Sequence, residues 1–447
     1  MIRRWREIER WIETTAGEAR ASGFPLKALS ELIVPRHESV RVDGVLGDWQ
    51  AITIKFSGEV LPRDRAEAFK GAMFAAYPGD LVFSKIDARN GAVGLIPDSI
   101  PKAVITPEYP VFTPKPEKLR PAFLNHLLRA AHFKADLQRK ASGTSGRKRV
   151  TPEGFLSLEV PVPSLDEQDA LVTVYAEALT RAEQLEQEAE VIERAGWQAF
   201  EAALGVAPPP PLPDRPVFVA RFKDVERWSH DGILRGVTGS GSTTLEATTE
   251  LLGNALLEVR HGCSKGPSKK STPLRVLKIS AVTKGRLDLA ENKFIADEPA
   301  LREQFALKKG DILMCRTNGT LAYVGMSALV ESDIDDMIFP DKVIRVRPNL
   351  DKIEPEFLWR LLQVPAVRSQ IEAAARTAVG NFAIGGKDIK ALKVPLPTPA
   401  HQKDLAQALN DAVIRAKSKR TEATALRSAA WDAFESALFT PTEPSAA

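Results

Sequence analysis

A segment of about forty residues occurs twice in this chain, and this repeat constrains the possible fold more than any other feature of the sequence. The first copy covers residues 164–204 and the second covers residues 398–438, and the two align without a gap. Identical side chains recur at a constant offset of 234 residues: Gln168 and Gln402, Arg181 and Arg415, Trp197 and Trp431, Phe200 and Phe434. The chain therefore contains one structural unit in two copies, built around this segment.

Both copies carry the start signals of a long helix. Ser164 is followed three residues later by Glu167, and this capping box satisfies backbone N–H groups that the first helical turn leaves unpaired. In the second copy Thr398 can cap the helix, and Pro399 follows at the first helical position, where its missing N–H costs nothing. Gly205 is a stop signal for the first copy. A helix of about forty residues has a length of roughly 60 Å.

Apolar and small residues recur at alternating spacings of three and four along both copies, which is the pattern of a coiled-coil seam. The small residues allow two helix axes to approach closely. The seam extends to Ala199 and Ala203 in the first copy and to Ala433 and Ala437 in the second. The residues that we expect to pair the helices are Leu171, Ala178, Ala182, Leu185, Ile192, Leu405, Ala412, Ala416 and Leu426.

A second apolar stripe lies off this seam at matched positions in both copies. Its members are Trp197, Phe200 and Leu204 in the first copy, and Trp431, Phe434 and Leu438 in the second. Because the seam does not need them, we expect these side chains to dock the helices onto the globular parts of the chain. The alternative is a pair of unrelated surface helices, which does not account for the matched aromatic positions.

Length and composition describe an ordinary globular protein. At 447 residues, with 44% hydrophobic and 27% charged residues, the chain is long enough for two or three domains with sizeable cores. It has no apolar run of about 18 residues, which a membrane span needs, and its charged N-terminus lacks the apolar core of a signal peptide. With only Cys263 and Cys315 present, we expect a protein of the reducing cytoplasm.

The alternation of strand-rich stretches with the two long helices predicts an α+β fold, with two mixed α/β domains separated by those helices. Residues 208–211 are all proline and predict a stiff, extended linker. The predicted boundaries are an N-terminal helix at 1–22, a first mixed domain at 23–163, the central long helix at 164–206, a Pro-rich linker at 207–216, a second mixed domain at 217–397, the C-terminal long helix at 398–439 and a tail at 440–447.

The repeat extends beyond the helices into the two mixed domains. The segment PAFL at 121–124 matches PEFL at 355–358, again at the offset of 234. Nearer to the start of each domain the offset is 231: Gly79-Asp80 matches Gly310-Asp311, and Val93-Gly94 matches Val324-Gly325. A small insertion between the motifs accounts for the difference. The intervening loops diverge, notably 35–75 against 260–308, which predicts two sites of the same kind with different specificity.

The motifs of methyl-transfer and nucleotide-hydrolysing enzymes are absent from the sequence. There is no glycine-rich cofactor loop with an Asn/Asp-Pro-Pro-aromatic tetrapeptide, as an amino-methyltransferase needs, and no GxxxxGK[ST] phosphate loop. The six histidines are scattered, and His261 with Cys263 alone cannot furnish a four-ligand zinc site. We therefore expect no catalytic residue and no metal site in this chain.

Asp80 and Lys85 have the residue types of a nuclease core, but the matching positions in the second half are Asp311 and Arg316. Arginine stays protonated and cannot substitute for a catalytic lysine. The two Gly-Asp pairs are better explained as tight turns that lead into a strand.

Clusters of Lys and Arg are the positive signal for a ligand, since the net charge of +3 is itself too small to indicate a polyanionic partner. Residues 259–287 contain eight Lys and Arg without an acidic residue, and residues 139–149 contain five. Loops that mix cations with Gly, Ser and Thr suit phosphate contacts. The segments SKIDARNG at 84–91 and CRTNGT at 315–320 present side-chain types that read base edges in the major groove.

The candidate DNA-contacting residues fall in these four segments. They are Ser84, Lys85, Arg89 and Asn90; Arg147, Lys148 and Arg149; Lys265, Lys269, Lys270 and Arg286; and Arg316 and Asn318. The alternative for the basic clusters is a solvated surface loop, and the alternative for the two shorter segments is a hairpin turn.

The order and twofold recurrence of these motifs resemble the specificity subunits of Type I restriction–modification systems over nearly the whole chain. The resemblance rests on two strand motifs (PGDLVFSKIDARNGAVG and KGDILMCRTNGTLAYVG), two junctions (VPVPSLDEQ and VPLPTPAHQ) and the long helices that follow them. The second junction departs from the usual Glu-Gln by having His401-Gln402, which weakens one capping box.

This resemblance implies two target-recognition domains, each of which reads one half of a bipartite double-stranded DNA sequence. It implies that the long helices pair as an antiparallel coiled coil with pseudo-twofold symmetry and fix the unread spacer. Two DNA methyltransferase subunits, and motor-nuclease subunits in the full complex, are the implied partners. The chain itself is then catalytically silent and binds no cofactor, while its partners use S-adenosylmethionine, ATP and Mg²⁺.

Two other functions stay open on the sequence alone. One is a self-contained DNA-modifying enzyme with an unrecognised site, which methylation or cleavage by the purified chain supports. The other is a duplicated scaffold that binds only protein, which a lack of DNA binding in the presence of a methyltransferase partner supports.

Overall fold

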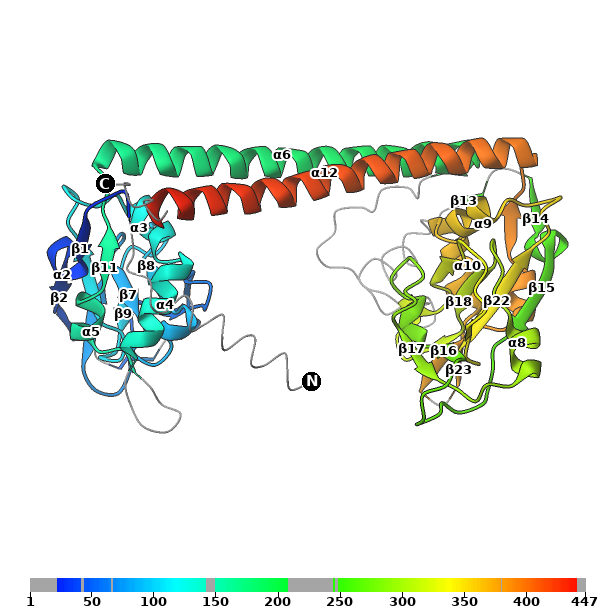
Figure 1. The fold of residues 1–447 in the computed structure, drawn as a ribbon, viewed down its shortest axis with the longest axis horizontal. Coiled ribbons are helices and arrows are strands. Elements are labelled where there is room, and N and C mark those ends of the chain that lie inside the picture. The colour runs from blue at the N-terminus through cyan, green and yellow to red at the C-terminus, as the bar shows by residue number, and fades with distance from the viewer. Residues whose placement is uncertain are drawn as a thin grey trace, which may run out of the picture. The chain divides into compact units, whose positions relative to one another are not determined.

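The structure is a computed structural model that separates into two compact units, each of which takes half of both long helices (Figure 1). Unit 1 comprises residues 1–186 and 420–447, and unit 2 comprises residues 187–419. The residues described are 22–41, 44–65, 67–141, 149–207, 244–245, 248–378 and 380–439.

Unit 1 contains two main sheets. The first has the order β2-β10-β7-β8 and is antiparallel throughout; its strands are β2 (Ile33–Arg36), β10 (Val111–Pro114), β7 (Leu81–Phe83) and β8 (Val93–Leu95). The second has the order β3-β6-β9-β4-β5; its strands are β3 (Ser39–Val40), β6 (Met73–Ala76), β9 (Ala103–Ile105), β4 (Gln50–Ile54) and β5 (Val60–Pro62). Within it β4 and β9 run parallel. A separate pair joins β1 (Leu26–Ala28) to β11 (Glu159–Pro161).

Helices cover the first sheet of unit 1 and complete its core. They are α2 (Leu29–Leu32), α3 (Pro121–Leu127), α4 (Ala131–Lys140) and α5 (Pro152–Leu156), with a 3-10 turn η1 (Ala88–Asn90). Three phenylalanines stack at the centre of this core: the ring centroids of Phe83 and Phe155 lie 4.4 Å apart, and those of Phe83 and Phe112 lie 6.1 Å apart. All three are buried, so this layer is the apolar anchor of the unit.

Unit 2 repeats this plan with different sheet sizes. Its main sheet has the order β15-β22-β18-β20, formed by β15 (Leu256–His261), β22 (Val343–Pro348), β18 (Ile312–Cys315) and β20 (Ser327–Leu329). A second sheet contains β17 (Asn292–Phe294), β16 (Arg275–Leu277) and β21 (Met337–Ile338), with β16 and β21 parallel. A third contains β19 (Thr317–Asn318), β24 (Asn381–Ala383) and β23 (Arg376–Ala378). Two strand pairs join β14 (Thr249–Leu251) to β25 (Lys393–Pro395) and β12 (Val206–Ala207) to β13 (Thr244–Leu245).

The helices of unit 2 match those of unit 1 at the expected offset. The helices α9 (Pro355–Leu361), α10 (Pro365–Ala374) and α11 (Gly386–Lys390) each begin 234 residues after α3, α4 and α5. The parallel strand β21 likewise begins 234 residues after β9. The other helical segments are α8 (Pro299–Phe305) and the 3-10 turns η3 (Leu252–Ala255), η4 (Ile279–Ala281) and η5 (Leu321–Tyr323). The predicted internal repeat is therefore present at the level of secondary structure.

One detail of the predicted repeat is wrong. Leu81 pairs with Leu95 in unit 1, whereas its counterpart Ile312 pairs with Leu329 in unit 2, so β8 and β20 correspond at an offset of 234. The predicted match of Val93-Gly94 with Val324-Gly325 does not hold. The insertion lies in the connection between β18 and β20. Gly325 in this connection has φ +78°, and a Cβ there would lie 2.4 Å from Ile371 Cγ2, so the position requires glycine.

The two long helices are α6 (Leu165–Ala203) and α12 (Pro399–Phe439). The predicted capping box is present at the start of α6: Ser164 N–H donates to Glu167 Oε2 (2.8 Å), and Glu167 N–H donates to Ser164 Oγ (3.3 Å). Pro399 is the first residue of α12, as predicted. After α6 ends, Gly205 adopts φ +66°, which confirms its role as the stop.

Within each unit the two helices run antiparallel. In unit 1, the Tyr175 ring on α6 lies 5.7 Å from the Trp431 ring on α12, and further along α6 Glu186 Oε2 accepts from Arg427 Nη2 (3.1 Å). Ala182, Leu185 and Ala423 are buried together between these contacts. In unit 2, Lys419 pairs with Glu188, and residue 196 on α6 faces residue 412 on α12. Residue numbers rise along one helix as they fall along its partner, which confirms the predicted antiparallel pairing. At Gly196 an added Cβ would lie 2.7 Å from Ala412 Cβ, so the helices approach closely there.

The predicted seam is correct in its middle and wrong at its ends. Ala182, Leu185, Ala412 and Ala416 are buried and Leu426 packs against the seam, whereas Ala178 and Ile192 are half-buried. Leu171 and Leu405 are half-buried and pack against the globular cores of their own units. Ala199, Ala203, Ala433 and Ala437 are exposed. Near these ends the globular part covers a different face of each helix. The three-four spacing of the coiled-coil seam therefore no longer predicts which helix residues are buried.

The off-seam stripe docks each helix end onto a globular core, as predicted. Phe434 and Leu438 are buried in the core of unit 1, where the Phe434 ring lies 6.1 Å from that of Phe123. Phe200 and Leu204 are buried in the core of unit 2, where the Phe200 ring lies 5.7 Å from that of Phe357. These ring pairs are equivalent in the repeat. Burying a large aromatic side chain contributes on the order of 2 kcal/mol, so each pair is a substantial anchor.

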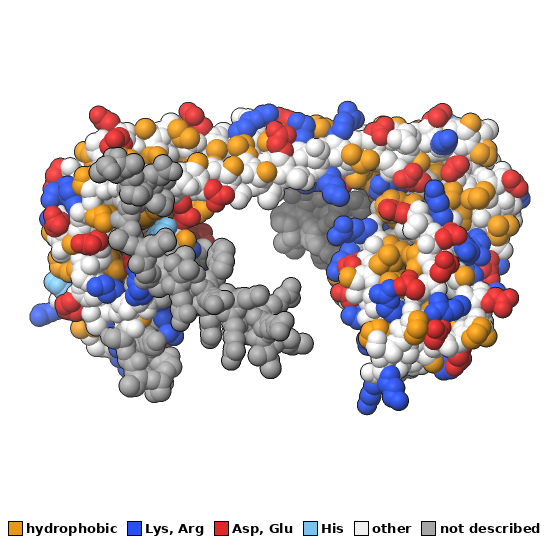
Figure 2. All heavy atoms as spheres, viewed as in Figure 1, with side chains coloured by type: hydrophobic (Ala, Val, Ile, Leu, Met, Phe, Trp, Pro, Cys, Tyr) orange, Lys and Arg blue, Asp and Glu red, His pale blue; other side chains and the backbone are white. Residues whose placement is uncertain are grey.

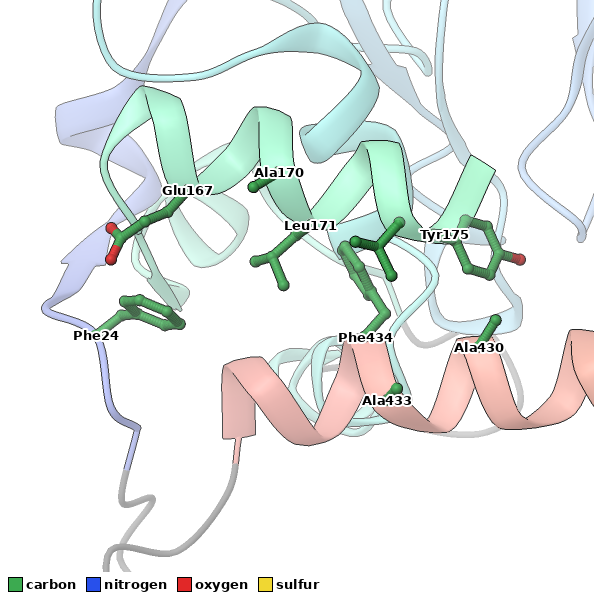
Figure 3. A pocket seen from close by; sticks show the side chains of 9 residues that line it. Phe24, Glu167, Ala170, Leu171, Tyr175, Ala430, Ala433 and Phe434 are labelled. Carbon is green, nitrogen blue, oxygen red and sulfur yellow. The ribbon is translucent and has the colours of Figure 1, made fainter. Parts of the chain in front are cut away.

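Beside this anchor in unit 1 lies a mainly apolar pocket of about 290 Å³ (Figure 3). Leu171 and Tyr175 extend from α6 and Ala430 and Ala433 from α12, while Phe24 closes one side. The alanines of α12 that the seam pattern assigned to helix pairing thus line the edge of this pocket.

The predicted N-terminal helix, most of the Pro-rich linker and the tail lie outside the described residues. Among the helices that the structure describes, none is long and apolar enough to cross a membrane.

Candidate nucleic-acid interface

A buried glutamine ties the first turn of each long helix to its globular part. In unit 1, Gln168 Nε2 donates to the carbonyl oxygens of Lys118 and Pro163 (2.9 Å each), and Gln168 Oε1 accepts from Arg120 N–H (2.9 Å). In unit 2, Gln402 Nε2 donates to the carbonyl oxygens of Lys352 (2.9 Å) and Pro397 (2.7 Å), and Gln402 Oε1 accepts from Glu354 N–H (2.9 Å). Both side chains are fully buried. The same junction therefore joins the long helix to the globular part in both units.

The two Gly-Asp pairs are structural turns, as predicted. Gly79 and Gly310 adopt φ +82° and +88°, and the following aspartates are buried. Asp80 Oδ1 accepts from Thr113 Oγ1 (2.8 Å), and its other oxygen lies 2.8 Å from Arg36 Nε. These contacts satisfy the carboxylate within its own unit.

The second aspartate is satisfied in the same way from a different strand. Arg347 donates from Nε and Nη2 to the two carboxylate oxygens of Asp311, at 2.7 Å each. The carboxylate hydrogen bond holds the pKa of the Arg347 guanidinium above its ordinary value. A carboxylate clamped by a bidentate arginine is not available as a catalytic base or metal ligand.

Lys85 and Arg316 occupy the same place in the two units. Lys85 N–H donates to Glu108 O (3.0 Å) and Lys85 O accepts from Val150 N–H (2.8 Å). Arg316 N–H donates to Lys342 O (2.9 Å) and Arg316 O accepts from Ile384 N–H (3.0 Å). The equivalence predicted from the sequence is confirmed, and a cation stands at this position in both units.

The segment after Lys85 is a compact turn. Ser84 is buried, and its Oγ accepts from Asp87 N–H (3.2 Å), so Ser84 shapes the turn and offers little surface to a ligand. Arg89 is half-buried, and its Nε has no hydrogen-bond partner among the described residues. Asn90 is exposed, and its amide donates to Asp87 Oδ1 (3.2 Å). Of these predicted contact residues, Asn90 is the most accessible.

The second predicted cluster of unit 1 is only partly described. Arg147 and Lys148 lie outside the described residues. Arg149 is exposed and forms an ion pair with Glu108 (3.2 Å), next to the backbone position that Lys85 uses. Arg149 and Lys85 are therefore brought together by one segment around Glu108.

In unit 2 part of the corresponding segment is a short strand. Arg316 donates from Nη1 to Asp341 O (3.1 Å), and Thr317 and Asn318 form β19, which pairs with β24. Asn318 is half-buried and its Oδ1 accepts from Thr320 N–H (3.0 Å). The sequence left a hairpin turn as the alternative for residues 315–320, and a turn alone does not account for β19, whose pairing partner β24 comes from later in the chain.

The long basic run of unit 2 is largely neutralised in space. Five of its eight cations form ion pairs with acidic residues, all of which lie outside the run: Arg260 with Glu258, Lys265 with Glu298, Arg275 with Asp336, Lys278 with Glu291 and Lys284 with Asp288. Figure 2 shows Lys and Arg side chains interspersed with Asp and Glu on the visible face of this unit. A charge run in the sequence is therefore not a uniform positive patch on the surface.

Three cations of the run have no ion pair to any residue that the structure describes. Lys269, Lys270 and Arg286 are exposed, and all three belong to the predicted contact set. Lys265 was predicted alongside them but is paired with Glu298. A free, exposed lysine gains most from a phosphate, because it gives up no existing partner.

Two titratable groups near Arg316 have shifted pKa values. Partial desolvation of its ring and the neighbouring Arg316 charge lower the pKa of His261, which favours its neutral form. Burial raises the pKa of the Cys315 thiol to about 11, so this cysteine is not a nucleophile at neutral pH. No group of three or more His, Cys, Asp or Glu residues able to hold a metal was found among the described residues.

The comparisons with known proteins agree with the fold. No protein-family model matches the chain. It is 26% identical over 299 residues to the Type I restriction enzyme EcoKI specificity subunit of Escherichia coli strain K12, which covers 66% of this chain and 59% of that protein. It is 22% identical over 298 residues to the Type I restriction enzyme StySPI specificity subunit of Salmonella potsdam, covering 66% and 58%. The chain thus spans about three fifths of the length of these relatives.

Solved structures of the same kind share the fold. The HsdS subunit from Thermoanaerobacter tengcongensis superposes with a TM-score of 0.52 at 16% identity, over 96% of this chain and all of that one. A chain from work on complex assembly and conformational transition of the type I R-M system gives 0.59 at 15% identity, over 95% and 100%. The resemblance to Type I specificity subunits that the motifs indicated is confirmed by these likenesses.

Proposed function

We propose that this chain supplies DNA sequence recognition to a Type I restriction–modification complex. Each globular part reads one half of a bipartite double-stranded target, and the paired helices set the spacer between the halves. The observation that carries this proposal is that one junction, with an equivalent buried glutamine and an equivalent aromatic anchor, recurs in both units beside loops of different sequence. A constant frame with variable loops is what a pair of readers with different targets requires.

The named relatives support this proposal over its alternatives. Both of the sequence relatives described above are specificity subunits of Type I restriction enzymes, which favours neither a self-contained modifying enzyme nor a protein-only scaffold. The clamped aspartates argue in the same direction, since the residues that most resembled a nuclease core serve as turns.

The partners follow from the same proposal. Two DNA methyltransferase subunits dock on the chain, and motor-nuclease subunits join in the full complex, all in the cytoplasm. S-adenosylmethionine, ATP and Mg²⁺ belong to those partners, and this chain takes no catalytic step. Purified alone, it is expected neither to methylate nor to cleave DNA.

The direct test is to co-express the chain with its methyltransferase subunit and to map the methylated positions on DNA. Two short specified sequences, separated by a gap of fixed length and unspecified sequence, are the expected result. A continuous recognition sequence would refute the proposal, and so would methylation by the chain without its partner.

A further inference from the structure

The predicted contact strand of unit 2 lies beside a hairpin that the sequence did not single out. Strands β23 and β24 pair antiparallel, and Gly380, the residue before β24, adopts φ +76°. On its other edge β24 pairs with β19, so that Thr317 faces Ala383 and Asn318 faces Phe382. The hairpin and the predicted contact residues therefore form one small sheet.

The register of this hairpin puts an arginine and an asparagine on one face. Arg376 lies opposite Ala383, and Ala378 lies opposite Asn381, so Arg376 and Asn381 share a face. Both side chains are exposed. Phe382 points to the other face and packs against the core of the unit, which fixes the hairpin in place. The hairpin is thus anchored by Phe382 and exposes the side chains of Arg376 and Asn381 on its other face.

The guanidinium of Arg376 is available to a ligand because no described acidic residue pairs with it. No ion pair joins Arg376 to any described residue, in contrast to the five paired cations of the basic run. Arginine recognises guanine, and asparagine recognises adenine, through two parallel hydrogen bonds in the major groove. That groove is about 12 Å wide and admits a two-stranded β-ribbon. The hairpin is a two-stranded ribbon of this kind, and it carries both side-chain types.

The other half of the chain carries cations at the equivalent place. Because Val150 and Ile384 bond to the equivalent residues Lys85 and Arg316, the hairpin at 376–383 corresponds in sequence to residues 142–149. That stretch contains Arg147, Lys148 and Arg149. Two stretches of unrelated sequence at one position in the repeat both carry cations, which suggests a shared ligand.

We propose that the β23–β24 hairpin enters the major groove of one half-site and that Arg376 and Asn381 determine specificity there. The inference rests on the proposed function and deepens it by naming the reading element of unit 2. The competing role for the same residues is to contact phosphates, which positions the protein but carries no sequence information.

The test uses the complex assembled with its methyltransferase subunits. Three variants, Arg376→Ala, Asn381→Ala and Arg376→Lys, are compared by selection from DNA randomised within each half-site. Each is expected to relax preference at one or two base pairs of a single half-site and to lower affinity for the native sequence by about ten- to a hundredfold. Arg376→Lys is the sharpest variant, since it keeps the charge but loses the planar pair of donors.

The matched control is Lys309→Ala, which removes an exposed cation before β18, whereas β19 follows the other end of that strand. It is expected to leave base preference unchanged. Variants that weaken all sequences equally and reduce the salt slope by about one phosphate contact would overturn the proposal in favour of backbone contacts. Unchanged binding would overturn it outright. A wild-type complex without any sequence preference would instead refute the proposed function, and equal thermal unfolding of all variants shows that each is folded.

Discussion

Gln168 and Gln402 make the same three backbone hydrogen bonds in the two units, each to residues 234 positions apart in the chain. Each side chain uses both amide hydrogens and its oxygen, and each is fully buried. The neighbouring residues differ: Glu167 precedes the first and His401 precedes the second. The glutamine is thus the part of the junction that the repeat preserves.

Replacing either glutamine by alanine is expected to destabilise its unit markedly. The change leaves two carbonyl groups and one N–H without a partner, and each buried group left unsatisfied costs about 1–3 kcal/mol. Water entering the cavity offsets part of this, so we expect a net loss of about 2–4 kcal/mol for Gln168→Ala in denaturant unfolding. The control is Gln187→Ala on the exposed face of α6, which should change stability by less than about 0.5 kcal/mol. Equal effects of the two changes would show that the junction is not held by this side chain.

The close helix contact in unit 2 predicts a strict size limit at Gly196. A leucine there would meet Ala412, and overpacking costs about 1–3 kcal/mol, which exceeds the roughly 1 kcal/mol gained by removing a glycine from a helix. Gly196→Leu is therefore expected to lower the free energy of unfolding, while Ala195→Leu at the exposed neighbouring position leaves it nearly unchanged. An unaltered unfolding midpoint for Gly196→Leu would mean that the helices do not touch there.

The ion pairs of unit 2 sort its lysines into two groups with different effects on DNA binding. Lys269→Ala and Lys270→Ala are each expected to reduce the slope of log K against log salt concentration by about 0.9, provided that each lysine contacts one phosphate. Lys265→Ala is the control with the same charge change, and it should alter the slope less because Glu298 already holds that lysine. A larger effect of Lys265 than of Lys269 and Lys270 would contradict this assignment.

His126 predicts a pH dependence for unit 1. Its ring packs against Tyr175 and Phe434, and burial, with the nearby Arg129 charge, lowers its pKa. A lowered folded pKa means that the unfolded chain binds a proton more readily. The contribution of neutral His126 to stability is therefore complete above about pH 6.5 and is lost as pH falls through the lowered folded pKa.

The corresponding measurement compares the pH profile of unfolding for wild type, His126→Phe and His37→Gln. Below about pH 6.5 the His126→Phe variant should lose less stability than wild type, and the exposed control His37→Gln should follow wild type. Identical profiles for His126→Phe and wild type would show that this residue is not held neutral. The equivalent position in unit 2 is Arg360, which donates from Nε to Asn410 Oδ1 (2.9 Å). This position therefore holds a histidine in unit 1 and an arginine in unit 2.

The features that follow from local chemistry could be predicted from the sequence. The capping box at Ser164, the first helical position of Pro399 and the stripe of Phe200 and Phe434 depend on residues within a few positions of one another. Because the sequence repeats, a feature predicted in one half could also be predicted at the matching position of the other half.

The features that depend on distant segments could not be predicted in this way. Periodicity identified the seam but not where the globular part covers a different helix face, so Ala199 and Ala433 were assigned wrongly. The basic run appeared uncompensated because the acids that pair with Lys265 and Arg275 lie beyond its end. The β23–β24 hairpin has strands of only three residues, which are too short for an alternating pattern to be recognised.

The central claim, that each globular part reads its own half of the target, is tested most directly by exchanging one part. Residues 24–163 are replaced by the equivalent segment of a divergent specificity subunit, and methylated positions are mapped with the methyltransferase subunits present. The expected result is a new sequence in one half-site, with the other half-site and the spacer length unchanged. A change in both half-sites would contradict the account.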